Sequence, residues 1–232
     1  MPERAAFWRA VDWSAPWLTP YAQIAHGVVA RLEQGASVAQ ALGGDGLQFV
    51  PQQELPDGEP YESFVRRSGT IPTRDNLHDL FNGLVWRCFP VLKRRLNGLH
   101  AAQIATEGVG AMRGPLRDAL TLFDENGALL RAPPALVEAL RARDWPRLFV
   151  VQRERWRDVR VTLVGHALLE KLVQPRKPIT AHVWLHEAPL KPDTLATKAF
   201  LTLPVLGVPG WWPANEDPAF YADIDVFRPP RR

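Results

Sequence analysis

The stretch TRDNLHDLFNGLVWRCF, from Thr73 to Phe89, combines a helical pattern with an unusual set of polar side chains. Its apolar residues recur three and four positions apart, as they do on one face of a helix, and they are Leu77, Leu80, Phe81, Leu84, Val85 and Cys88. Thr73 follows Pro72 and is a competent N-cap. The pattern therefore predicts a helix that begins at Thr73 and continues to about Phe89.

The polar residues of this helix are expected on a second face. Asp75, His78, Asp79, Asn82 and Trp86 lie at offsets of three, four, seven and eleven, which brings their side chains together. A solvated face is usually built from Lys, Glu, Gln and Arg, which favour helix more than Asp, Asn and His do. Two interpretations stay open. The face is a functional site or buried network, or it is simply solvated, with Asp75 stabilised by the helix dipole.

The whole chain predicts one α+β domain over residues 1–232. Its 232 residues, with 46% hydrophobic content, can bury a full core. Helical patterns dominate the first two thirds, beginning with a helix from Thr19 or Pro20 that ends before Gly35. Strand patterns come later, so we expect a predominantly helical fold with a small mixed or antiparallel sheet.

Three segments are predicted to build this sheet. The segment ALTLFDENGALL, residues 119–130, indicates a hairpin, because Asn126 and Gly127 adopt positive φ at low cost. Asp124 and Glu125 could capture a metal, but acids beside an Asn-Gly turn are more often turn residues, and we interpret them so. Residues 159–164 and 179–186 supply the other strands, since they are rich in β-branched and aromatic side chains.

Histidines in these later segments extend the set of candidates. After residue 164 a helix is predicted near Gly165, on which His166 and Glu170 are four positions apart. A carboxylate at this spacing can orient an imidazole that serves as general base or metal ligand, although the same spacing also occurs in ordinary surface pairs. Strand alternation over residues 179–186 puts Thr180, His182, Trp184 and His186 on one face. The zinc motif HExxH is absent there, because Val183 stands in place of its glutamate.

Several motifs of the chain resemble those of a bacterial family. They are PTRDNLHDLFNGLVW, FPVLKRRLN, RDALTLFDENGALL, GHALLEKL, ITAHVWL and LGVPGWW. Through them the chain, from about Tyr61 to Arg228, resembles the domain of unknown function 3025. The resemblance implies that these motifs belong to one fold, and it implies no activity, cofactor or catalytic residue.

The net charge of +3 is unevenly distributed. Residues 45–62 contain five acidic residues and no lysine or arginine, whereas residues 141–160 contain seven arginines against three acids. The second stretch also contains Trp145, Phe149 and Trp156, and a mixture of cations and flat rings suits nucleic acid. An arginine-rich surface with rings packed beneath it has the same composition, and we favour that interpretation. Partners therefore stay open.

The sequence favours a cytoplasmic protein without a membrane partner. No apolar run approaches the roughly eighteen uncharged residues that a membrane span needs. Glu3, Arg4, Arg9 and Asp12 place charges where a signal peptide would have its apolar core. The single cysteine, Cys88, can form neither an internal disulfide nor a cysteine-based zinc site. Because dinucleotide and Walker motifs are also missing, no cofactor-binding residues are predicted.

These residues lead to the hypothesis of a hydrolase that acts on phosphoesters. The catalytic candidates are Arg74, Asp75, His78, Asp79, Asn82, His166, Glu170 and His182. One imidazole would be the general base on water, a carboxylate would orient it, and Arg74 or Lys171 would offset developing negative charge. Imidazoles and carboxylates are also common ligands, so the cluster could bind a divalent metal. The alternative is a non-catalytic binding or scaffold protein, in which the polar cluster is a structural network and the arginine-rich stretch meets an acidic partner or nucleic acid.

Overall fold

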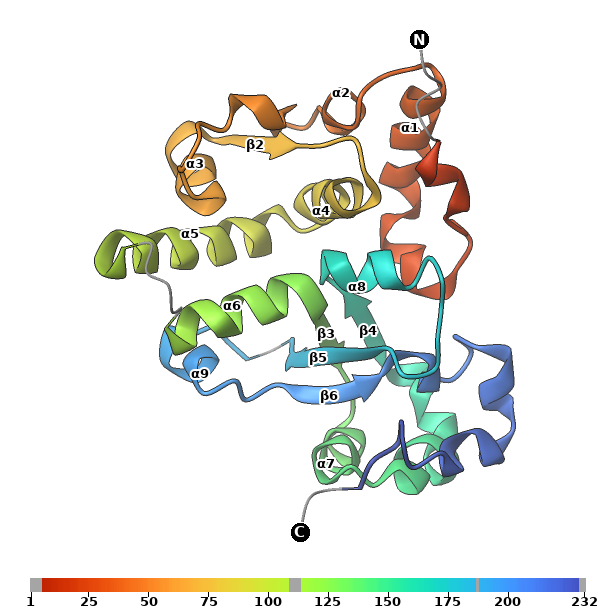
Figure 1. The fold of residues 1–232 in the computed structure, drawn as a ribbon. Coiled ribbons are helices and arrows are strands. Elements are labelled where there is room, and N and C mark those ends of the chain that lie inside the picture. Colours follow the sequence, from red (N-terminus) through yellow and green to blue (C-terminus); the bar gives the residue numbers. More distant parts are fainter. Residues whose placement is uncertain (1–5, 109–113, 187, 230–232) are drawn as a thin grey trace.

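The computed structural model describes residues 6–108, 114–186 and 188–229. Glu3 and Arg4, two of the charges at the start of the sequence, lie outside the described residues. The chain is an α+β protein in which helices predominate, as the sequence predicts (Figure 1). No helix within the described ranges is both long and apolar enough to cross a membrane.

The first half of the chain is mainly helical. A 3-10 turn, Pro16–Tyr21, leads into α1 (Ala22–Glu33), which is followed by α2 (Val38–Leu42), α3 (Tyr61–Ser68), α4 (Leu77–Cys88) and α5 (Pro90–Glu107). The predicted N-cap at Thr73 is wrong, because Thr73 ends a strand and Asn76 caps α4 by accepting the Asp79 main-chain N–H at 2.8 Å. The strands β1 (Gln48–Pro51) and β2 (Thr70–Thr73) form a parallel pair that the sequence analysis did not predict.

The second half contains a mixed sheet and its covering helices. Its elements are α6 (Pro115–Asn126), β3 (Gly127–Arg131), α7 (Pro134–Ala142), β4 (Arg160–Leu163), α8 (His166–Lys171), β5 (Thr180–Leu185), α9 (Pro192–Ala196) and β6 (Leu201–Pro204). The strand order is β4-β3-β5-β6, with β3 and β5 parallel and the outer pairs antiparallel. Three of these strands were predicted from the sequence, and β6 was not.

The predicted hairpin at Asn126 and Gly127 is wrong. The residues before it form α6, whose buried side chains Leu116, Ala119, Leu120 and Phe123 recur at helical spacing. Only the residues from Gly127 onward form a strand. Gly127 has a φ of −78° at the end of α6, so the turn does not use the positive φ on which the prediction rested.

Two chain segments cross closely at Gly127 and Gly165. The Gly127 carbonyl oxygen accepts the main-chain N–H groups of Val164 and Gly165, each at 2.9 Å. This crossing joins the end of α6 to the start of α8. It also fixes the distance between Glu125, at the end of one helix, and His166, at the start of the other.

Gly165→Ala is expected to lower the free energy of unfolding by about 1 to 3 kcal/mol. A Cβ on Gly165 would lie 2.4 Å from the Gly127 nitrogen and 2.6 Å from both the nitrogen and the Cα of Asn126. These are backbone atoms, which cannot turn aside as a side chain can. Urea denaturation measures the effect, and Gly98→Ala, whose Cβ would meet nothing within 4 Å, is the matched control. Equal stability of Gly165→Ala and the unchanged chain would contradict the crossing.

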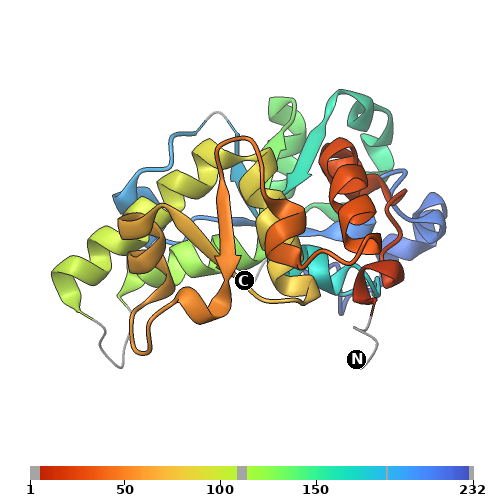
Figure 2. The same cartoon turned by 90° about the horizontal axis from the view of Figure 1, so that it is seen from above.

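The two halves of the chain pack around one large hydrophobic core, and a second, smaller cluster is formed by Leu47, Val65, Ile71 and Trp86. Helices α6 and α8 cover one face of the mixed sheet and α7 lies on the other (Figure 1). Helix α4 packs on α8, and α5 packs on α6. In both views α4 lies between α1 on one side of the molecule and α5 on the other (Figures 1 and 2). The start of α4 is thereby brought to the start of α8 and the end of α6.

Candidate metal centre

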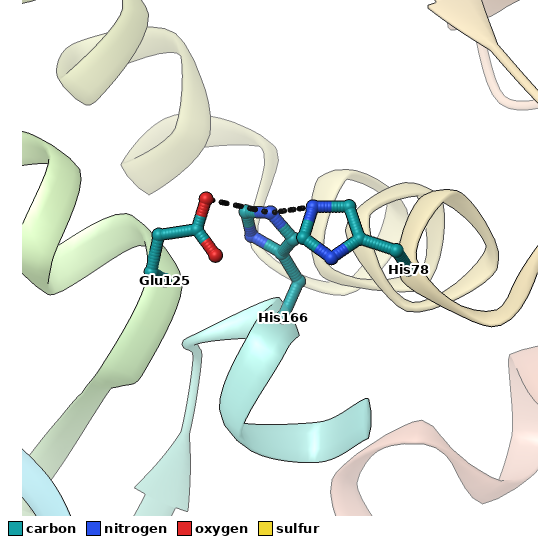
Figure 3. Close-up of side chains that lie close together, drawn as sticks. All are labelled: His78, Glu125 and His166. Atoms are coloured by element: carbon teal, nitrogen blue, oxygen red, sulfur yellow. Dashed lines mark hydrogen bonds and ion pairs between the residues drawn. The ribbon is translucent and has the colours of Figure 1, made fainter. Parts of the chain in front are cut away.

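Three helix ends bring two histidines and a carboxylate together. His78 lies in the first turn of α4, His166 is the first residue of α8, and Glu125 is the penultimate residue of α6. Their side chains point toward one another (Figure 3). The Nε2 atom of His166 lies 3.0 Å from Nε2 of His78 and 3.7 Å from Oε1 of Glu125. One donor atom of each residue lies within 4.8 Å of the other two, so the three side chains can share one ion.

Glu170 determines which nitrogen of His78 carries the proton. Its Oε2 atom lies 3.0 Å from Nδ1 of His78. Because an ionised carboxylate can only accept a hydrogen bond, the proton belongs on Nδ1 and Nε2 keeps its lone pair. The spacing of four residues in the sequence predicts that Glu170 orients His166. The structure instead pairs Glu170 with His78 across the packing of α8 on α4, because His166 is turned into the core while Glu170 is half-exposed.

His166 is buried beside a second carboxylate. Burial lowers the pKa of its imidazole to about 4, because the charged form loses its hydration, so the ring is neutral at pH 7. Nδ1 of His166 lies 3.9 Å from Oδ2 of Asp124, whose other oxygen accepts a hydrogen bond from Lys93 Nζ at 2.6 Å. This distance is too long for a hydrogen bond, and the buried Nδ1 has no hydrogen-bond partner among the described residues, but the negative charge that faces it favours a proton on that atom. The Nε2 atom of His166 then also keeps its lone pair.

These two tautomers set two lone pairs against each other at the 3.0 Å distance between the Nε2 atoms. The alternative is that His166 carries its proton on Nε2 and donates it to Nε2 of His78, which keeps both rings neutral but places the lone pair of the buried Nδ1 3.9 Å from the Asp124 carboxylate. A divalent cation accepts both lone pairs and leaves both rings neutral. Ligands that lie about 2.0 to 2.2 Å from a tetrahedral ion are themselves about 3.3 to 3.6 Å apart, close to the 3.0 and 3.7 Å found here.

The centre is open to solvent on the side of His78 and Glu125, whose side chains are 32% and 34% exposed. Burial raises the pKa of the Glu125 carboxyl, while the positive charges of Lys93 and Lys171 act in the opposite direction. A bound cation would favour the ionised carboxylate further. The exposed side leaves room for water or a substrate atom as a further ligand, as catalytic metal sites require.

The other candidates in the Thr73–Asn82 segment lie outside this group and join the surrounding elements. Arg74 donates to Asp79 through its main-chain N–H, Nε and Nη2, at 2.6 to 3.0 Å. Asn82 Nδ2 donates to the Tyr61 hydroxyl at 3.1 Å. Asp75 precedes α4 and accepts the first main-chain N–H of α2 at 2.7 Å. The predicted single polar face is thus divided, with His78 in the candidate centre and the others in contacts that connect α2, β2, α3 and α4.

His182 and Lys171 complete the set of sequence candidates. His182 lies in β5 with its ring against Phe200, 6.1 Å between centroids, and the metal-capable group within the described residues does not include it. Lys171 ends α8, and its Nζ donates to Asn126 Oδ1 at 2.7 Å, one residue beyond Glu125. Of the two cations that the sequence suggested for offsetting negative charge, Arg74 is bound to Asp79, and Lys171 is therefore the better candidate.

Sequence reasoning missed Glu125, Asp124 and Lys93. The two acids were interpreted as turn residues because the Asn-Gly pair follows them. The helical spacing of the apolar residues up to Phe123 was the signal that could have placed both acids on a helix end. Nothing local indicates Lys93, which is 4% exposed and comes near the centre only through the packing of α5 on α6.

Two of the three aromatic rings in the arginine-rich stretch, residues 141–160, are too deeply buried for base stacking. Trp145 and Phe149 are 4% and 0% exposed and stack on each other in the core. The half-buried Trp156 donates its Nε1–H to the Leu148 carbonyl at 2.8 Å. Arg153 is bound to Glu216 at 2.6 Å. Trp145 and Phe149 therefore belong to the core, and Trp156 is held by a main-chain contact.

The fold and the centre define an α+β protein with a histidine-carboxylate cluster at the junction of three helix ends. Residues 47–196 and 187–231 match the model of the family described as "Protein of unknown function (DUF3025)", and the chain belongs to this family. The matched region includes His78, Glu125, His166 and Glu170. No curated protein and no solved structure matches the chain.

Proposed function

We propose that this protein is a metal-dependent hydrolase in which His78, His166 and Glu125 hold one divalent transition-metal ion. The observation that carries the proposal is the 3.0 Å approach of two Nε2 atoms whose partner nitrogens both face carboxylates. Two imidazoles and one carboxylate with an open side form a ligand set of catalytic zinc, and related sets hold other transition metals.

The chemistry proposed is hydrolysis of a phosphoester. When bound by His78, His166 and Glu125, the ion would supply Lewis acidity and would lower the pKa of a water molecule enough to make it nucleophilic near neutral pH. The water oxygen forms a bond to phosphorus and gives its proton to solvent, the bond from phosphorus to the leaving oxygen breaks, and that oxygen takes a proton from solvent. Glu170 holds His78 in position throughout, through the 3.0 Å contact with Nδ1.

Lys171 is the residue proposed to offset negative charge that develops on the phosphoryl oxygens. Its hydrogen-bond partner Asn126 is neutral, so its charge is not cancelled by an ion pair within the described part of the chain. Its bond to Asn126 holds it beside Glu125. A cation fixed near the reacting atoms stabilises the transition state more than the ground state when charge builds up there.

A non-catalytic binding or scaffold protein is the second candidate. The observation in its favour is that Asp79 and Asn82, two residues of the same polar segment, are buried and bound to Arg74 and Tyr61. In this alternative His78 and His166 extend that network and bind no ion.

Metal titration of chelator-treated protein separates these proposals. We expect one equivalent of Zn²⁺, Co²⁺ or Mn²⁺ to bind in calorimetry, and the reloaded protein to hydrolyse p-nitrophenyl phosphate or bis(p-nitrophenyl) phosphate. One bound ion without hydrolysis of either ester would reject the phosphoesterase and keep the metal site. No bound ion would reject both and favour the non-catalytic alternative.

Glu170→Gln is expected to weaken metal affinity by about 10- to 100-fold, because the amide no longer fixes the His78 tautomer as a carboxylate does. Stability should change little, since the Glu170 side chain is 40% exposed. Competition against a chromogenic chelator measures the affinity. The matched control is Glu154→Gln, which changes a carboxylate that is 88% exposed and outside the centre. Equal affinities of the two variants would show that Glu170 does not support the site.

A further inference from the structure

A cleft with two cationic side chains lies beside the proposed metal centre. It has a volume of about 370 Å³ and is lined by Lys171, Arg176, Pro178, Ile179 and Thr180. Lys171 belongs to both sites, because it lines the cleft and is held by Asn126 next to Glu125. The cleft and the centre are therefore connected through Lys171 and Asn126.

The positive charge in this cleft is uncompensated. No acidic residue lines it, and neither Lys171 nor Arg176 forms an ion pair with any residue that the structure describes. The next residue shows the contrast, because Lys177 is paired with Asp223 at 2.9 Å and lies over the Phe220 ring, 4.2 Å from its centroid. Lys177 is thus neutralised by Asp223, whereas the adjacent Arg176 is exposed to solvent.

The loop that presents Arg176 is preorganised. Pro175 and Pro178 fix two of its φ angles, and the Ile179 main-chain N–H donates to the Arg176 carbonyl at 3.0 Å. Thr180 Oγ1 donates to the Pro178 carbonyl at 3.1 Å where β5 begins. A loop held in this way loses less conformational freedom when a ligand binds.

We propose that Lys171 and Arg176 bind a phosphate group of the substrate. This inference rests on the proposed hydrolase and names its substrate class, a phosphorylated compound. A planar guanidinium can bind two phosphate oxygens at once, and an ammonium adds a point charge. Two cations match the two negative charges of a phosphate monoester, whereas a single carboxylate would leave one cation without a partner.

The test uses inorganic phosphate as the probe and chelator-treated protein, so that metal cannot bind the probe. At low ionic strength, calorimetry should detect phosphate binding, and Lys171→Met and Arg176→Met should each weaken it by about tenfold or more. Arg155→Met is the matched control, because Arg155 is exposed and does not line the cleft. Circular dichroism checks that the variants are folded.

Three results would overturn this inference. They are absence of phosphate binding without metal, binding that both variants leave unchanged, and equally tight binding of acetate. Each can occur while the protein still binds one metal ion, and in that case the proposed hydrolase stands and only the phosphate site fails. Conversely, if the protein bound phosphate but no metal, the phosphate site in the cleft would be supported and the metal-dependent mechanism would be rejected.

Discussion

His166→Ala is expected to remove stoichiometric metal from the protein, with affinity falling by more than about 100-fold. Loss of an outer carboxylate alone weakens a metal site by up to that factor, and this change removes a direct ligand. The Nε2 atom of His166 is central to the group, since both measured approaches, 3.0 Å to His78 and 3.7 Å to Glu125, include it. Elemental analysis after dialysis against each metal gives the metal-to-protein ratio.

His78→Ala provides the second arm of this test, because His166 is buried and its truncation also leaves a cavity. The His78 side chain is 32% exposed, so its removal should cost the metal with less effect on folding. His26→Ala, which changes an exposed histidine of α1, should keep the full ratio. If His78→Ala bound metal as the unchanged protein does, the two histidines would not share one ion.

The fold was predictable from local patterns to a greater extent than the candidate centre. Helical spacing located α1 and α4, and β-branched residues located β4 and β5. The centre depends on contacts between residues 88 and 92 positions apart, which join His78 to His166 and to Glu170. Spacing within one helix therefore paired Glu170 with the wrong histidine.

Glu125 illustrates why the remaining ligand was missed. The Asn126-Gly127 pair indicates a turn, whereas the preceding apolar residues have helical spacing. Burial of these apolar side chains in the core determined the structure, and the segment is a helix. Gly127 is required for a different reason, since a Cβ there would lie 2.3 Å from the Phe123 carbonyl oxygen, and the close crossing itself depends on the missing Cβ of Gly165. Gly165 and the position of the acid thus depend on a long-range contact that no local pattern contains.

Lys93→Met is expected to lower the free energy of unfolding by about 1 to 3 kcal/mol, because it leaves the Asp124 carboxylate, whose side chain is 24% exposed, without its partner. Lys93 is 4% exposed, and its Nζ lies 2.6 Å from Asp124 Oδ1. Burial by itself would raise the pKa of Asp124, but the charge of Lys93 and its hydrogen bond act against burial, and that pKa lies below its usual value. Urea denaturation of metal-free protein measures the change without a contribution from metal binding.

The double variant Lys93→Met with Asp124→Leu should regain much of the lost stability, since two apolar side chains can replace a buried ion pair at little net cost. Lys198→Met is the control, because Lys198, like Lys93, pairs with an aspartate of α6. Its partner is Asp118 at 3.4 Å, both side chains are nearly half exposed, and its loss should cost only about 0 to 1 kcal/mol. Recovery of stability without recovery of metal affinity would mean that Lys93 and Asp124 position His166 for the ion. A double variant with full metal affinity would show that this buried pair supports the fold alone.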